Sequence, residues 1–145
     1  MDGGSPARRF RESRLATVVA SAVVLVLILI PGDEVPKIEI PGLDKLVHLL
    51  MFACWALALR FDWELFRRRP AFLVAAVALA GPLTEVMQLF APGRSFDPAD
   101  MVADLAGGIL AALLGGKVVL FADRLLSGPG EPEEPANPTE PPEAR

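Results

Sequence analysis

The sequence has few of the residues that support thiol, metal or nucleophilic chemistry. Its 145 residues include one cysteine and one histidine, and no serine stands in a nucleophile-elbow pattern. Cys54 lies inside an apolar run and has no partner for a disulfide within the chain. We therefore expect no cofactor, assign no metal site, and lean against an enzyme.

An excess of basic residues is also missing. The net charge is -4, and five glutamates lie after Gly130, so the rest of the chain is close to neutral. The arginines gather beside apolar segments, in the stretch 8–14 and at 60 and 67–69. This distribution is typical of topology signals and predicts no nucleic-acid partner.

Long apolar runs dominate what is present. Hydrophobic residues make up 52% of the chain, and the mean hydropathy is +0.42. A helix needs roughly 20 residues to cross the hydrocarbon core. The sequence predicts an all-α, four-span transmembrane helix bundle over residues 15–126, with spans at about 15–31, 43–61, 71–90 and 99–121.

The loops predict the orientation of this bundle. Lys and Arg collect on the cytoplasmic side, and here the N-terminus and the loop at 67–69 are strongly basic while the loop from 31 to 44 is mostly acidic. Both termini are thus expected in the cytoplasm, as a basic segment over 1–14 and a disordered Pro/Glu-rich tail over 127–145. A cleaved signal peptide is the alternative for the first segment, and a retained anchor is favoured.

Polar residues at the ends of the last three spans are the main functional signal. In the predicted topology all of them lie in the outer half of the membrane, where ionisable groups are costly and mark functional sites. Residues three and four apart share a helix face, so each string can face a common pocket. The predicted functional cluster is Lys45, His48, Glu85, Gln88, Arg94 and Asp104, with Asp44, Asp97 and Asp100 as supporting or helix-capping residues.

Small residues recur every four positions along the fourth span. Such rows let helix backbones approach closely in lipid. We assign helix packing to Gly107, Gly108, Ala111 and Gly115, and expect this helix to be central. A homo-oligomer through the same helix is a further possibility.

Three spaced motifs follow one another along the chain: Asp44-Lys45-x-x-His48-x-x-x-Phe52, Glu85-x-x-Gln88-x-x-x-Pro92-x-Arg94-Ser95, and Asp97-x-x-Asp100-x-x-x-Asp104-x-x-Gly107. Their order and spacing, over about residues 42–116, resemble the VanZ-like family of small bacterial membrane proteins. One departure is Asp104, where members frequently carry Asn before the glycine. The resemblance implies a multi-pass helical bundle in the bacterial cytoplasmic membrane, and a family whose founding member is associated with teicoplanin resistance.

Three functions fit these observations. The first is binding of a membrane lipid or lipid-linked cell-envelope molecule, with Lys45 and Arg94 contacting an anion. The second is a membrane-surface enzyme that uses His48 with carboxylates, in an acid–base role or through a divalent metal held by mixed nitrogen and oxygen ligands. The third is a structural or oligomeric scaffold in which a buried ion network only fixes helix register.

Overall fold

The computed structural model describes residues 12–34 and 40–127. Within these ranges the chain is helical and contains no strand, which confirms the all-α class. Of the predicted basic segment only residues 12–14 are described, and of the predicted tail only residue 127. The remaining predictions for both ends lie outside the described residues.

Each predicted span corresponds to one long helix. The helices in chain order are α2 (Leu15–Leu29), the 3-10 turn η1 (Gly32–Glu34), α3 (Leu43–Asp62), the short α4 (Glu64–Arg68), α5 (Pro70–Gln88) and α6 (Pro98–Ser127). Both α5 and α6 begin with proline, whose fixed φ and missing N–H suit the first helical position. The last helix continues past residue 121, where the apolar run was expected to end.

Among the described helices, two are long and apolar enough to cross a membrane: α5, and α6 over Pro98–Leu125. α2 is apolar but has 15 residues, about 22 Å of helix against a hydrocarbon core of roughly 30 Å. α3 has 20 residues but carries charged side chains near both ends. The four-span topology with cytoplasmic termini thus remains a prediction.

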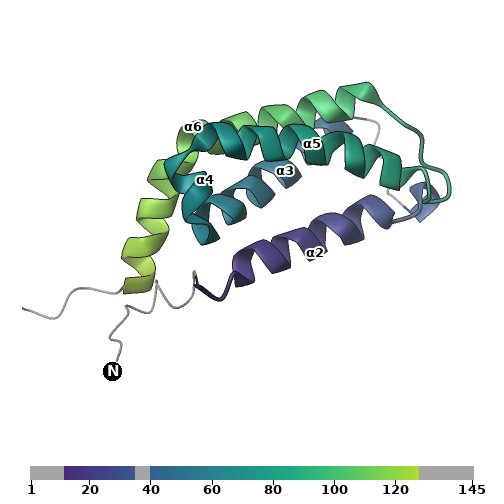
Figure 1. The fold of residues 1–145 in the computed structure, drawn as a ribbon. Coiled ribbons are helices and arrows are strands. Elements are labelled where there is room, and N and C mark those ends of the chain that lie inside the picture. The colour runs from purple at the N-terminus through teal and green to yellow at the C-terminus, as the bar shows by residue number, and fades with distance from the viewer. Residues whose placement is uncertain (1–11, 35–39, 128–145) are drawn as a thin grey trace, which may run out of the picture.

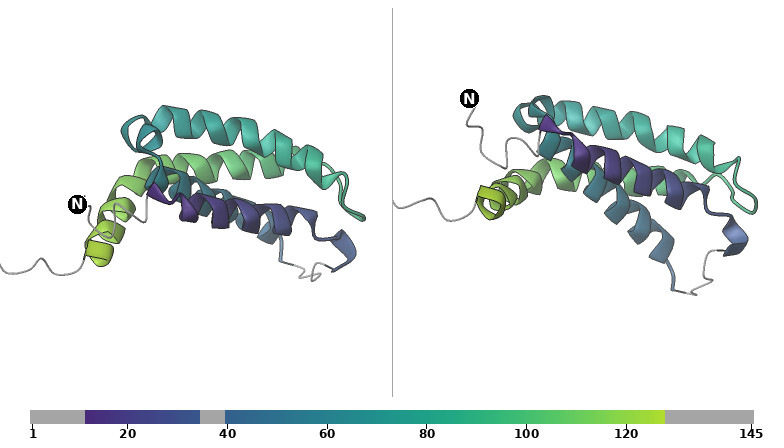
Figure 2. Two further views of the ribbon diagram at one scale, coloured as in Figure 1. Left: turned by 60° about the horizontal axis from the view of Figure 1, so that its bottom comes forward. Right: turned by 90° about the horizontal axis from the view of Figure 1, so that it is seen from below.

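The long helices form an elongated bundle whose two ends differ (Figure 1). One end gathers η1, the start of α3 and the connection between α5 and α6, while α4 lies toward the other (Figures 1 and 2). Closest packing is between α3 and α6, and α5 also packs against α6. The first end therefore collects the polar motifs of the sequence.

The core is small and apolar. It contains Phe52, Ala56 and Leu59 of α3, Leu73 and Val77 of α5, and Ala111 of α6. Many large apolar side chains instead face outward, and Leu79 and Leu113 are 77% and 75% exposed. An apolar exterior of this extent is typical of a surface that contacts lipid or another protein.

Close approach of α6 to its neighbours depends on glycine. A Cβ added at Gly107 would lie 2.3 Å from the carbonyl oxygen of Leu49, and one at Gly108 would lie 2.8 Å from the Val77 side chain. The small-residue face of α6 is therefore occupied by α3 and α5 of the same chain. An oligomer through this helix stays a prediction.

The C-terminal part of α6 turns away from the bundle axis (Figures 1 and 2). Arg60 of α3 donates from Nη1 to the carbonyl oxygens of Ala111 and Ala112, at 3.3 and 2.5 Å. Gly115 and Gly116 follow, one turn further along α6. A side chain that bonds the helix carbonyls and a pair of glycines are both recognised causes of helix bending, and together they account for the turn. Arg60 thus has a packing role beyond the topology signal inferred from sequence.

Candidate functional site

Three helices contribute the polar residues of the candidate site. Lys45 and His48 lie one turn apart at the start of α3, and Asp100 and Asp104 lie one turn apart at the start of α6. Glu85 lies in the last turn of α5. The predicted i, i+3 and i, i+4 stripes therefore meet where these three helices come together.

Lys45 is the cation of an outer cluster. Its Nζ lies 2.8 Å from Asp44 Oδ2 and 2.8 Å from Asp100 Oδ1, and it also contacts Asp97 Oδ2. The hydrogen bond from Lys45, with a second one from the backbone N–H of Ala99, holds the pKa of Asp97 below its usual value. Three carboxylates thus surround one ammonium group.

Asp97 and Asp44 differ in how they relate to their helices. The Oδ1 atom of Asp97 accepts a hydrogen bond of 2.8 Å from the N–H of Ala99, so Asp97 caps the start of α6 while it binds Lys45. The residue that precedes α3 is Gly42, in the left-handed conformation with φ 76°, and it makes no side-chain cap. Asp44 is inside the helix, and its carboxylate contacts Lys45 instead.

His48 belongs to an inner, buried cluster. Its Nδ1 lies 2.9 Å from Asp104 Oδ1, and its Nε2 lies 3.7 Å from Asp100 Oδ2. The first contact is a hydrogen bond, whereas the second is too long for one. Asp104 is fully buried and His48 is 7% exposed. Asp104, at the position where an Asn is frequent in the motif, therefore places a carboxylate against the imidazole.

Glu85 completes the inner cluster from α5. It is fully buried, and its Oε2 accepts a hydrogen bond of 3.0 Å from the backbone N–H of Asp97. Its other oxygen, Oε1, has no hydrogen-bond partner among the described residues, and neither has Asp104 Oδ2. Buried oxygens without partners are uncommon in folded proteins and need an explanation.

Arg94 does not join the carboxylates. No carboxylate among the described residues lies within 4.0 Å of its guanidinium group, and its Nε donates to the carbonyl oxygen of Ile30 at 3.2 Å. A second hydrogen bond runs from the N–H of Gly32 to the carbonyl oxygen of Pro92, at 2.8 Å. It joins the segment after α2 to the loop between α5 and α6, as the Arg94 bond does. The loop that carries Arg94 is thus fastened to the end of α2.

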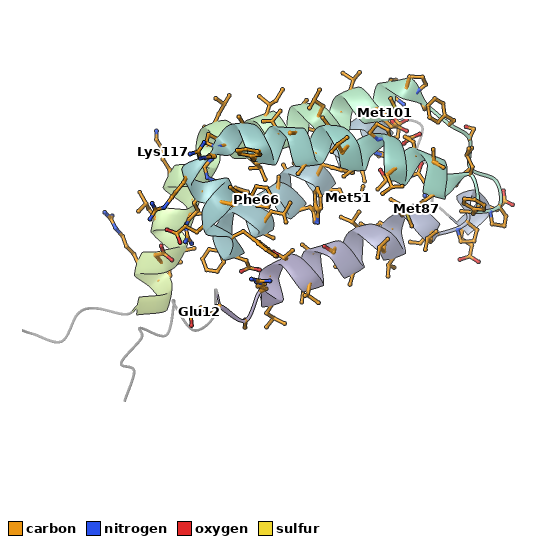
Figure 3. The ribbon with its side chains drawn as sticks, viewed as in Figure 1. Glu12, Met51, Phe66, Met87, Met101 and Lys117 are labelled. Carbon is orange, nitrogen blue, oxygen red and sulfur yellow. The ribbon has the colours of Figure 1, made fainter. Side chains whose placement is uncertain are left out.

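A pocket of about 660 Å³ opens beside these groups. Apolar side chains of α2 and α3 form part of its wall, including Leu27, Ile28 and Met51, the last of which is labelled in Figure 3. Its polar wall is formed by Glu34, Asp44, His48, Gln88, Arg94, Ser95, Asp97 and Asp100. Glu85 and Asp104 are buried and do not line it. The pocket is therefore amphipathic, with one cation that is not paired with a carboxylate.

Sequence reasoning placed Asp100 among the supporting residues, yet this carboxylate joins the two clusters, since Oδ1 faces Lys45 and Oδ2 faces His48. The sequence-based prediction also did not include the part of the pocket wall that α2 contributes. The spacing of Asp97, Asp100 and Asp104 was a signal for Asp100, because residues 100 and 104 share a helix face. No sequence signal indicates the contact of α2 with the pocket.

Comparison with known proteins identifies the family. The VanZ/LLP1 family model matches residues 6–120, most of the chain. The chain belongs to the VanZ/LLP1 family. It is 34% identical over 111 residues to the uncharacterized protein C11E3.10 of Schizosaccharomyces pombe, covering 75% of this chain and 67% of that protein. No solved structure matches the chain.

VanZ/LLP1 membership and the two long apolar helices together support a membrane protein. Because the similar protein C11E3.10 comes from a yeast, membership does not by itself place this chain in a bacterium. The bacterial cytoplasmic membrane and the multi-pass topology stay predictions.

Proposed function

We propose that this VanZ/LLP1 protein binds an anionic membrane lipid or a lipid-linked cell-envelope molecule in the pocket beside Arg94. The observation that carries the proposal is the amphipathic pocket, whose apolar wall suits an acyl or polyprenyl chain and whose polar wall presents a guanidinium group. Arginine binds phosphate and carboxylate groups through two parallel hydrogen bonds. Within the described residues, Nε is the one guanidinium nitrogen of Arg94 that makes a hydrogen bond, and its acceptor is the Ile30 carbonyl oxygen.

Arg94, and not Lys45, is the anion contact in this proposal. Lys45 is surrounded by three carboxylates, so an incoming anion would have to displace them. The carboxylates near the pocket repel an anionic headgroup. This repulsion favours a ligand whose negative charge lies close to Arg94. A lipid would meet these requirements if its anionic headgroup lay beside Arg94 and its chain ran along Leu27 and Ile28.

Lipid binding can be tested with full-length protein purified in detergent. Native mass spectrometry would measure retained lipid after exchange into phosphatidylglycerol or phosphatidylcholine. The expected result is preferential retention of phosphatidylglycerol, reduced by about ten-fold or more in Arg94→Gln, since a hydrogen bond to a charged group contributes about 1.5–3 kcal/mol. Arg68→Gln is the matched control, because Arg68 is largely exposed on α4 and pairs with Glu64.

Equal phosphatidylglycerol retention by the wild type and Arg94→Gln would overturn the proposal. The same holds if Arg68→Gln lowers retention as much, because the effect would then reflect overall positive charge. We also propose a role in glycopeptide resistance. It predicts that expression of the wild type, but not of Arg94→Gln, raises the teicoplanin concentration needed to inhibit a susceptible host.

A further inference from the structure

No ammonium or guanidinium group of residues 12–34 and 40–127 contacts Glu85 or Asp104 in the inner cluster. Five carboxylates meet at this end of the bundle, namely those of Asp44, Glu85, Asp97, Asp100 and Asp104. Among the described residues, Lys45 is the one ammonium group that contacts these carboxylates, and it reaches only Asp44, Asp97 and Asp100. Glu85 and Asp104 are both fully buried, where an uncompensated charge is strongly unfavourable.

We infer that His48, Glu85 and Asp100 form a binding site for a divalent transition-metal ion. One ligand atom from each of these residues lies within 4.8 Å of the other two. The three residues come from three helices, α3, α5 and α6. Glu85 provides the independent support, because it is fully buried and its Oε1 has no partner among the described residues.

The geometry around His48 matches that of a metal ligand. When Asp104 is ionised it only accepts hydrogen bonds, so Nδ1 of a neutral imidazole carries the proton in the 2.9 Å contact, and Nε2 then has the lone pair that a metal ion needs. A ligating histidine commonly donates its other N–H to a carboxylate in this way. Asp104 is then a positioning residue that orients the imidazole.

The separation of two of the three ligand atoms also fits. His48 Nε2 and Asp100 Oδ2 lie 3.7 Å apart. Two ligands, each about 2.1 Å from one tetrahedral metal ion, lie about 3.4 Å from each other. A shift of a few tenths of an ångström would therefore bring both atoms into coordination, without a change of helix position.

The outer carboxylates form a useful contrast. Asp44, Asp97 and Asp100 also lie close enough together to share an ion, but the ammonium group of Lys45 already contacts all three. In the inner group, Lys45 contacts only Asp100 among the described residues, and this group adds an imidazole nitrogen. One nitrogen and two carboxylates favour Zn²⁺ or Mn²⁺ over Ca²⁺ or Mg²⁺, which prefer oxygen ligands alone.

The site would keep an open coordination position. Three protein ligands leave a fourth position for water or substrate in a tetrahedral site. His48 and Asp100 both line the pocket, so this position would face the pocket. The metal inference does not depend on Arg94, and the two can fail separately.

The single histidine of the chain permits a direct test. Full-length protein without a histidine tag, labelled with ¹⁵N-histidine and treated with a chelator, would give one pair of imidazole nitrogen signals. Addition of one equivalent of Zn²⁺ should shift the Nε2 signal and leave Nδ1 protonated. Titration with Zn²⁺, and Mn²⁺ in parallel, would give the affinity and the number of ions bound.

Glu85→Gln and Asp100→Asn should weaken Zn²⁺ binding by at least about ten-fold, and Asp104→Asn by about 10–100-fold, which is typical of groups that orient a ligand. Glu64→Gln is the matched control and should bind as the wild type does, because Glu64 lies on α4, away from the site, and pairs with Arg68. The ¹⁵N measurement on the wild type remains decisive even if a variant does not fold. An Nε2 signal that Zn²⁺ does not shift and Mn²⁺ does not broaden, or equal affinity in Glu85→Gln and the wild type, would overturn the inference.

Discussion

Replacing Gly107 with alanine tests how the candidate site is held together. The new Cβ would lie 2.3 Å from the Leu49 carbonyl oxygen and 2.9 Å from the Ala53 nitrogen, both backbone atoms of α3. Ordinary contact begins at 3.4 Å, so α3 and α6 must separate locally by roughly 1 Å. Overpacking of this kind typically costs about 1–3 kcal/mol, and here no side chain can rotate to relieve it.

The effect should reach the inner cluster, because Gly107 lies three residues from Asp104. Gly107→Ala should therefore lower the unfolding free energy in detergent by about 1–3 kcal/mol, and weaken the His48 Nδ1 hydrogen bond seen by ¹⁵N spectroscopy. Gly116→Ala is the control, since its Cβ would meet only a guanidinium nitrogen of Arg60, at 3.3 Å. Equal stability of the two variants would refute the close backbone contact.

Three other results are expected. In a background with Cys54→Ser, a membrane-impermeant maleimide should label Ser95→Cys in intact cells and Arg68→Cys only after lysis; the opposite pattern would contradict the predicted orientation. The lowered pKa of Asp97 means that its ionised form stabilises the fold above the usual value of 3.8 and that this stabilisation is lost on further acidification. The melting-temperature advantage of the wild type over Asp97→Asn should accordingly persist from pH 7 to about 4 and disappear below; a constant difference down to pH 3 would exclude this origin. Asp62 Oδ2 accepts a 2.6 Å hydrogen bond from the Thr17 N–H in the first turn of α2. Asp62→Ala should therefore lower the unfolding free energy by about 0.5–2 kcal/mol, as loss of a helix cap does. Chemical denaturation that detects no change would argue against this cap.

The helices could be predicted closely from the sequence, because long apolar runs and their flanking prolines are local signals. The start of α3 is at Leu43 as expected, and α5 and α6 begin one residue before the predicted positions, at Pro70 and Pro98. The extension of α6 to Ser127 was not predicted, since the sequence after Phe121 is less apolar.

The gathering of polar residues at one end followed from topology and helix periodicity, but their pairing did not. Lys45 was expected near an anion, and its contacts with Asp97 and Asp100 depend on how α3 and α6 pack. Arg94 was expected in the functional cluster, in contact with a bound anion, and its bond to Ile30 depends on the position of α2. Such contacts span more than fifty residues of sequence, and no periodic pattern encodes them.

The two oxygens of Asp100 give the site a property that neither cluster has alone. Oδ1 is held by Lys45 and Oδ2 faces His48, so the charge of Asp100 is divided between the ammonium group and the inner cluster. A change at Lys45 would therefore alter how strongly Asp100 holds an ion beside His48. Coupling between binding sites is reciprocal, so an ion in the inner cluster would in turn weaken the hold of Asp100 on Lys45. The outer ammonium group and the inner ion would thus compete for one carboxylate, although they contact different oxygens.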